Sequence, residues 1–112
     1  MSSPSVETTP DDEPTWQQLA LSFKALADPT RLHLLKLIAT SPGSEACICH
    51  LIDPVGLSQP TVSHHMKLLT EAGLVTRKQR GKWAFYAIVP AAFDNLASSI
   101  FKINAPATYL KH

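Results

Sequence analysis

Apolar side chains recur every three or four residues along much of the chain, which is the period of a helix. Residues 15–27 open with a capping box formed by Thr15 and Gln18, so the first helix is predicted there. Its expected apolar face consists of Trp16, Leu19, Ala20, Phe23, Leu26 and Ala27. A second helix starts directly afterwards, because Asp28 can cap it and Pro29 suits a first helical turn. Its expected face consists of Leu32, Leu35 and Ile38.

Two more helices are predicted around a tight corner. Ser44 is a suitable N-cap for a short third helix over residues 45–53. Ser58 would cap a fourth helix, in which Pro60 occupies the permissive first turn and Gly73 closes the end. The inward positions of this fourth helix are Val62, Met66 and Leu69. The pattern is therefore helix, turn, helix.

After Gly73 the period of the apolar positions changes from helical to two. Residues 75–79 and 83–89 are rich in β-branched or aromatic side chains and are separated by a short polar turn, which predicts a β-hairpin. Pro90 then opens a last helix, whose expected face consists of Phe93, Leu96, Ala97, Ile100 and Phe101. The predicted fold class is mainly α with a two-stranded β wing, in the order α-α-α-α-β-β-α.

The length of 112 residues suits one domain. Residues 1–14 are acidic and hold almost nothing to bury, so we expect a disordered tail, with a domain over 15–105 and a C-terminal tail over 106–112. The uncharged stretch 83–93 is far too short to span a membrane, and the first residues lack the basic and apolar pattern of a secretory signal. A cytoplasmic location without a membrane partner is expected.

The charges are unevenly distributed, although the net charge is only +1. Residues 15–112 carry ten basic and five acidic side chains, which makes this part +5. Four of the cations fall in one six-residue stretch of the predicted hairpin: Arg77, Lys78, Arg80 and Lys82. A solvated hairpin would explain this cluster, and so would contact with nucleic acid phosphates.

The predicted fourth helix carries hydrogen-bonding side chains on its outward positions. These are Gln59, Thr61, Ser63, His64 and Lys67. A merely solvated helix would more often carry Glu and Lys pairs, whereas a helix in the major groove of DNA needs such donors and acceptors near its N-terminus. We therefore expect these residues to read double-stranded DNA, with His64 facing the DNA and His65 at the edge of the core.

The two cysteines of the chain, Cys47 and Cys49, lie two positions apart. In an intracellular protein this spacing favours metal or redox chemistry over a structural disulfide, although one buried cysteine can simply act as a small hydrophobe. With Ser44 as the cap, Cys47 would occupy the third helical position, where the helix dipole favours thiolate. The two sulfurs would then point about 200° apart, so binding one ion would distort this helix and tilt the next.

Two stretches of the chain resemble a known family. FKALADPTRLHLLKLI and GLSQPTVSHHMKLLTEAGLVTRKQRGKWAFYAI are similar to the ArsR/SmtB family of metal-responsive winged-helix repressors, and the resemblance covers about residues 16–101. It implies a homodimer joined through the first and last helices. It also implies binding to an imperfect palindrome in operator DNA and release of that DNA when an inducer arrives.

The stretch Glu45-Ala46-Cys47-Ile48-Cys49 resembles the E-L-C-V-C-D-L-C box of the arsenic-responsive members. The resemblance implies that Cys47 and Cys49 are arsenite ligands, so As(III) or Sb(III) is the expected inducer and no cofactor is required. The chain departs from the box at two positions, since Ile52 stands in place of the third cysteine and His50 in place of the acid. Water, His50 or an external thiol would supply the third ligand.

Other functions are less well supported by these residues. Members that sense cadmium or lead add cysteines from an N-terminal arm, and residues 1–14 contain none. Zinc-sensing members use Asp and His pairs on the last helix, where only Asp94 is present. A thiol redox or reactive-sulfur sensor of the same fold is the main alternative. A dithiol oxidoreductase is disfavoured, because the C-x-C of this chain lacks the strand-loop-helix context of a C-x-x-C motif. The sequence also shows no set of nucleophile, base and orienting residue that would suggest an enzyme.

Overall fold

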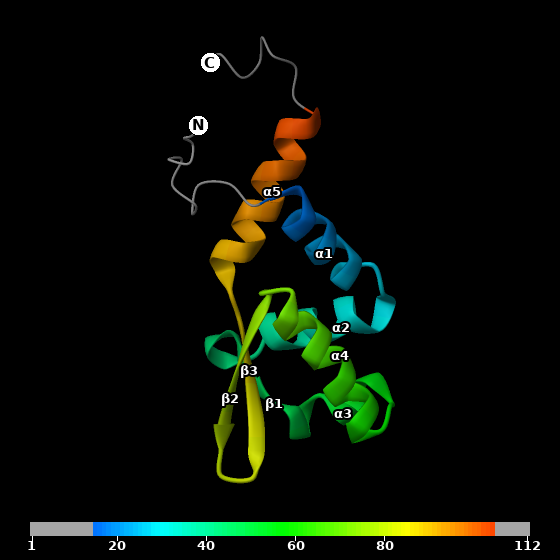
Figure 1. Cartoon of the computed structure of the whole chain (residues 1–112). Helices are drawn as coiled ribbons and strands as arrows, with labels where there is room; N and C mark the ends of the chain where they lie inside the picture. Colours follow the sequence, from blue (N-terminus) through cyan, green and yellow to red (C-terminus); the bar gives the residue numbers. More distant parts are fainter. Residues whose placement is uncertain (1–14, 105–112) are drawn as a thin grey trace.

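Residues 15–104 are described in a computed structural model, where they form five α-helices and a three-stranded antiparallel sheet (Figure 1). The elements in chain order are α1 (Trp16–Leu26), α2 (Pro29–Ala39), η2 (Pro42–Ser44), β1 (Glu45–Cys47), η3 (Ile48–His50), α3 (Ile52–Val55), α4 (Gln59–Glu71), β2 (Val75–Arg80), β3 (Trp83–Ile88) and α5 (Pro90–Asn104). The predicted tails, 1–14 and 106–112, lie outside the described residues. No helix among residues 15–104 is long and apolar enough to cross a membrane.

The predicted starts of the first two helices are confirmed. The Thr15 hydroxyl accepts a hydrogen bond from the Gln18 N–H, and the Gln18 side chain accepts one from the Thr15 N–H, both at 3.0 Å. Asp28 caps α2 by accepting the Arg31 N–H, also at 3.0 Å. Each cap satisfies a backbone donor that the first turn of a helix leaves without a partner.

The predicted apolar faces of α1 and α2 are only partly correct. In α1, Leu19 is buried while Trp16 remains exposed. In α2 the buried side chains are Leu34, Leu35 and Ile38, and Leu32 is 51% exposed. The buried arc of α2 is centred between Leu34 and Leu35, because this helix packs against α1, α4 and the sheet at once. Leu32 lies more than a quarter turn from that centre.

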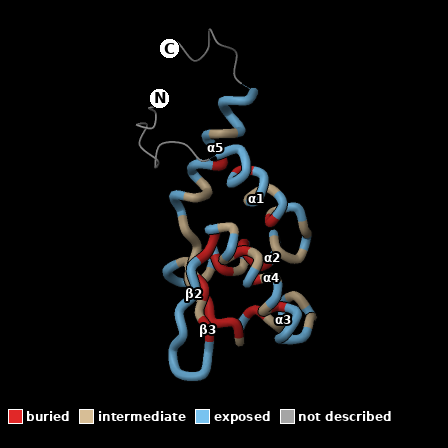
Figure 2. Tube along the Cα trace, in the orientation of Figure 1, coloured by how far each residue is buried: buried red, intermediate tan, exposed pale blue. Residues whose placement is uncertain are grey.

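The core lies where α2 and α4 meet the sheet (Figure 2). The largest fully buried side chains come from α2, α4 and the segments that flank them: Leu34, Ile38, Leu51, Val62, Met66, Leu69 and Leu74. The predicted inward face of α4 is therefore confirmed. Ser58 caps α4 by accepting the Thr61 N–H, and Gly56, with φ of 69°, adopts the left-handed conformation that ends α3.

The predicted helix over residues 45–53 is wrong. Residues 45–47 form the strand β1, which pairs antiparallel with β3 in the register Glu45↔Ala87, Ala46↔Tyr86 and Cys47↔Phe85. Ser44, the expected cap, has a positive φ of 54°. The strand forms because β3, already paired with β2 on one side, offers its other edge to the backbone of residues 45–47. One turn of 3₁₀-helix and the four-residue α3 complete this segment.

The predicted hairpin is confirmed, with β2 and β3 paired from Val75↔Ile88 to Arg80↔Trp83. We call residues 75–88 the wing; it projects from the helical body in Figure 1. The last helix, α5, starts at Pro90 as predicted. Its expected inward face is only partly correct, since Leu96 is buried and Phe93 packs against the core, whereas Ile100 and Phe101 remain exposed.

The Asp28 cap makes a prediction about acid stability. The hydrogen bond from the Arg31 N–H, helped by the nearby Arg31 charge and opposed by burial, holds the pKa of Asp28 below its usual value. A lowered folded-state pKa contributes stability that is present above the ordinary pKa and lost as the pH falls through the lowered one. Asn still caps a helix but carries no charge. We therefore expect Asp28→Asn to lower the Tm at pH 7, and the difference from the parent to shrink as the pH falls below 3.8, the ordinary pKa of an aspartate.

Thermal unfolding followed by circular dichroism across this pH range measures the difference. Asp94→Asn on α5 is the matched control, since it makes the same charge change at an exposed position. A Tm difference that stays constant or grows on acidification would contradict the role given to Asp28.

Candidate nucleic-acid interface and dithiol site

The outward residues of α4 and one face of the wing lie on either side of a groove of about 360 Å³. From α4 this interface groove is lined by Gln59, Ser63, Lys67, Thr70 and Glu71, and from the wing by Arg77, Gln79, Lys82, Ala84 and Tyr86. The structure thus brings together five residues that the sequence suggested separately as DNA contacts. A helix and a hairpin flanking one polar groove suit a duplex, because the helix fits the major groove and the hairpin reaches neighbouring phosphates.

The other four predicted DNA contacts, Thr61, His64, Lys78 and Arg80, do not line this groove. His64 and Thr61 are exposed on α4, and the Thr61 hydroxyl lies 3.0 Å from the Ser58 hydroxyl at the helix cap. Lys78 and Arg80 are exposed on the wing, but they do not line the groove. Alternate residues of a strand point to opposite faces, so Arg77 and Gln79 share one face of β2 while Lys78 and Arg80 share the other.

Gln79 is a groove residue that the sequence analysis missed. Its side-chain oxygen accepts a hydrogen bond from Arg77 Nη2 at 2.7 Å, and its amide nitrogen donates to the Gly81 carbonyl at 3.1 Å. Gln79 therefore ties the Arg77 guanidinium to the turn of the wing. The period-two alternation of β2 places Gln79 on the same face as Arg77, whereas the sequence prediction for the hairpin covered its cations alone.

The predicted position of His65 at the edge of the core is confirmed. His64 is exposed, whereas His65 is half-buried and its Nδ1 lies 3.2 Å from Arg31 Nη1. Arg31 also donates from Nε to the Ala25 carbonyl at 2.6 Å. Arg31, which was not among the predicted site residues, links the end of α1 and the start of α2 to the inner side of α4.

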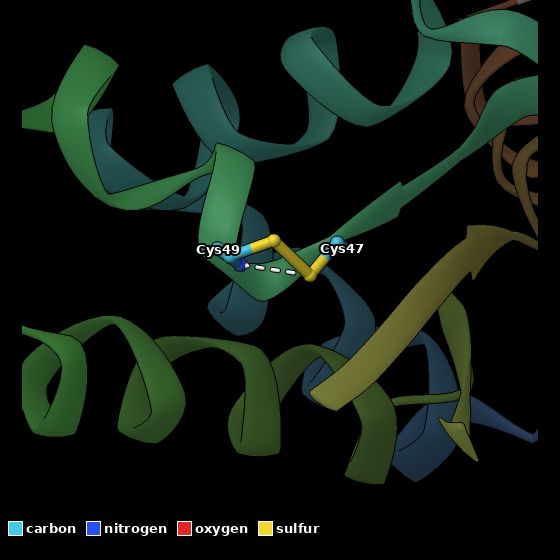
Figure 3. The surroundings of a disulfide bond; sticks show 2 residues. All are labelled: Cys47 and Cys49. Carbon is cyan, nitrogen blue, oxygen red and sulfur yellow. Dashed lines mark hydrogen bonds between the residues drawn. A yellow bond between two sulfur atoms is a disulfide. The ribbon is translucent and has the colours of Figure 1, made fainter. Parts of the chain in front are cut away.

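The sulfurs of Cys47 and Cys49 meet at the end of β1, where they are joined as a disulfide (Figure 3). The Cα atoms lie 5.1 Å apart, and the Cys49 N–H donates a hydrogen bond to Cys47 Sγ at 3.1 Å. The predicted 200° separation of the sulfurs is wrong, because Cys47 is extended and the chain turns at once into η3. The two sulfurs can therefore share one partner without unwinding a helix.

The arrangement fits a ligand that takes two sulfurs. Cys47 is only 3% exposed and Cys49 is half-buried, so the pair opens to solvent on the Cys49 side. Between residues 15 and 104 no group of three or more His, Cys, Asp or Glu side chains is placed to hold a metal ion. A soft, thiophilic ion suits such a pair better than a hard one, and a third ligand has to come from elsewhere.

Ile48 connects the dithiol pair to the interface groove. Ile48 stands between the two cysteines, is 2% exposed, and lines the groove together with Gln59 and Ser63. Because a packed interior has few voids that could absorb a shift, a change in the backbone at residues 47–49 must move the floor of the groove.

Comparison with known proteins agrees with this arrangement. The solution structure of a homodimeric winged helix-turn-helix DNA-binding domain from Mycobacterium bovis, a possible ArsR-family transcriptional regulator, matches with a TM-score of 0.63 and 26% identity over 77% of this chain and 79% of that one. The fold and the groove thus define a winged helix-turn-helix domain.

The family follows from the sequence relatives. The chain is 41% identical to an HTH-type transcriptional regulator of Methanocaldococcus jannaschii, over 79% of this chain and 92% of the relative. It is 34% identical to the arsenical resistance operon repressor of Staphylococcus aureus, over 80% and 84%. Residues 28–77 match the bacterial regulatory proteins of the arsR family. The chain belongs to the ArsR family.

The unequal burial of the cysteines predicts their order of reaction. In the reduced protein we expect iodoacetamide to modify Cys49 before Cys47, because Cys49 is half-buried and Cys47 is enclosed. Timed alkylation followed by peptide mass spectrometry measures both rates, and the denatured protein provides the control in which both thiols are accessible. Faster modification of Cys47 in the folded protein would contradict the geometry of this site.

Proposed function

We propose that the protein is a cytoplasmic, homodimeric transcriptional repressor that releases its operator DNA when As(III) or Sb(III) binds Cys47 and Cys49. The observation that carries the proposal is the position of this dithiol pair. The two sulfurs meet at the end of β1, and the buried Ile48 between the two cysteines lines the interface groove. Ligand binding and DNA binding therefore involve one continuous stretch of packed residues.

In the proposed complex α4 enters the major groove and the wing follows the flanking backbone. Gln59, Ser63 and His64 offer donors and acceptors to base edges from the N-terminal half of α4, with Thr61 and Lys67 beside them. The wing cations Arg77, Lys78, Arg80 and Lys82 contact phosphates, which position the protein without reading the sequence.

A second copy of the chain is proposed to cover α1 and the outer half of α5. Trp16 and Ile103 are 78% and 71% exposed, and they line a cavity of about 590 Å³ between these two helices. Leu21, Ile100 and Phe101 are also large, apolar and at least 48% exposed on the same helices. An apolar surface of this kind is rare on a monomer, and a two-fold dimer would present two α4 helices to the halves of a palindrome.

The inducer chemistry requires the reduced cysteine pair. When arsenous acid reacts with the Cys47 and Cys49 thiols, two arsenic–sulfur bonds form, and two hydroxyl groups leave as water with the two thiol protons. The third position of the arsenic keeps its hydroxyl or takes a small cellular thiol. Cys47 is held by the pairing of β1, whereas Cys49 belongs to a short 3₁₀ turn, so the turn is expected to adjust around the ion.

Release of DNA is then a difference in affinity between two arrangements of residues 47–49. Drawing the two thiols onto one ion moves Ile48, which lies between them and lines the interface groove beside α4. An inducer preference for the displaced arrangement of about 1–3 kcal/mol would lower DNA affinity 5- to 150-fold.

A thiol redox sensor of the same fold is the second candidate, and the disulfide between Cys47 and Cys49 favours it. Peroxide would oxidise the two thiols to this disulfide with release of two molecules of water. DNA release measured with arsenite, antimonite, zinc and peroxide side by side separates the two functions. Release by peroxide and not by arsenite would replace the proposed function with the redox one.

The DNA-reading part of the proposal predicts the effect of removing groove side chains. Gln59→Ala and Ser63→Ala should each weaken binding to a DNA sequence selected by the parent protein by about 1–3 kcal/mol for each lost base contact. Arsenite affinity should be unchanged, because the thiols lie on another element. His33→Ala, at an exposed position of α2 outside the groove and the proposed dimer surface, is the control and should have no effect. Variants that still distinguish selected from random DNA as the parent does would contradict the role of α4.

The sensing part of the proposal predicts that both cysteines are essential for release. In reduced protein, Cys47→Ser and Cys49→Ser should each keep the DNA affinity of the parent and abolish its response to arsenite, because one thiol cannot form the two-sulfur clamp. Titration of labelled DNA with each protein, with and without arsenite, measures both properties.

X-ray absorption at the arsenic edge should count two protein sulfurs per arsenic in thiol-free buffer. His50, the exposed neighbour of Cys49, provides the control. The His50→Ala variant should still release DNA when arsenite is added. Arsenite-induced release in a variant without either cysteine would refute the sensing site.

A further inference from the structure

Arg80, one of the expected phosphate contacts, already has an anionic partner in the structure. Its Nη1 and Nη2 atoms donate to the two carboxylate oxygens of Glu45 at 3.1 and 2.9 Å, across 35 positions of sequence. The guanidinium also lies over the Phe85 ring, 4.6 Å from its centroid. The two parallel hydrogen bonds make this a bidentate guanidinium–carboxylate pair. Arg binds phosphate with the same bidentate geometry.

The pair joins the wing to the strand that ends at the dithiol site. Glu45 is the first and Cys47 the last residue of β1, and alternation places both on the same face of the sheet. Phe85, which supports the guanidinium, is the partner of Cys47 in the β1–β3 register. The side chains of Arg80 and Glu45 are 47% and 30% exposed, so DNA can reach the Arg80 fork only in competition with Glu45.

We propose that Glu45 is a positioning residue that competes with the DNA backbone for Arg80 and so lowers the affinity of the wing for DNA. The inference rests on the DNA-binding part of the proposed function and not on the inducer. Arg77 and Lys82 line the interface groove, so the wing binds phosphate through them whether or not Arg80 is held. Arg80 adds a further phosphate contact only when its fork leaves Glu45, and β1 thereby sets how strongly the wing binds.

The test uses the full chain and a fluorescein-labelled duplex of random sequence, because a phosphate contact does not depend on the bases. Glu45→Gln removes the negative charge and should tighten binding about two- to fivefold, the range expected for an exposed ion pair. The plot of log K against log salt should steepen by about 0.9, because one more phosphate is neutralised. Asp53→Asn on α3 makes the same charge change at an exposed acid and should leave the salt slope unchanged.

The decisive comparison repeats Glu45→Gln in an Arg80→Gln background. There the substitution should change neither affinity nor salt slope more than Asp53→Asn does, because Arg80 is no longer present to be released. Weaker binding of the Glu45→Gln variant, or an effect that persists without Arg80, would overturn the inference while leaving the proposed function intact. A parent protein that did not bind duplex DNA would overturn both.

Discussion

The antiparallel pairing of β1 with β3 is the interaction on which the organisation of the site depends. Three residues, Glu45 to Cys47, fill the edge of β3 that β2 leaves open. This pairing holds Cys47 at the end of a strand, brings Glu45 within reach of Arg80, and lets the chain turn so that Ile48 enters the core. A helix over the same residues would separate the sulfurs and break the connection to the wing.

The wing has two different faces because a strand alternates its side chains. One face, with Arg77 and Gln79, forms the interface groove with α4, and Gln79 orients Arg77 there. The other face carries Arg80 and Phe85, and there Glu45 of β1, the strand that ends in the dithiol pair, meets the Arg80 guanidinium. A basic hairpin that looks uniform in the sequence therefore carries Arg77 and Lys82 along the interface groove and, on its other face, an Arg80 that is paired with an acid.

The inner side of α4 packs firmly against the rest of the domain. This packing holds the side chains on the outer side of the helix in position. Val62, Met66 and Leu69 are fully buried against α2 and the sheet, and His65 meets Arg31. Rigid support of this kind positions side chains for base contacts better than a mobile loop does. The exposed apolar surface of α1 and α5 lies away from the wing (Figure 1), so a partner bound there would leave the interface groove open.

The sequence by itself determined the parts of the protein in which local signals and packing agree. The caps at Thr15, Asp28 and Ser58, the apolar period of α4 and the alternation of the hairpin were read correctly, because each depends on neighbours within a few residues. Five residues of the interface groove followed from these elements: Gln59, Ser63, Lys67, Arg77 and Lys82. The cysteine spacing also identified the dithiol pair as the candidate sensing site, independently of its backbone conformation.

Only the tertiary structure decided the conformation of residues 45–50. Ser44 and the residues after it satisfy local rules for a helix start, but the open edge of β3, some forty positions away in the sequence, makes hydrogen bonds that a short helix cannot match. Contacts with residues that are distant in the sequence also explain the other differences between the predictions and the structure. Leu32 is exposed because several elements surround α2 at once, and the Arg80–Glu45 and Arg31–His65 contacts join residues more than thirty positions apart. Local periodicity carries no information about such distant partners.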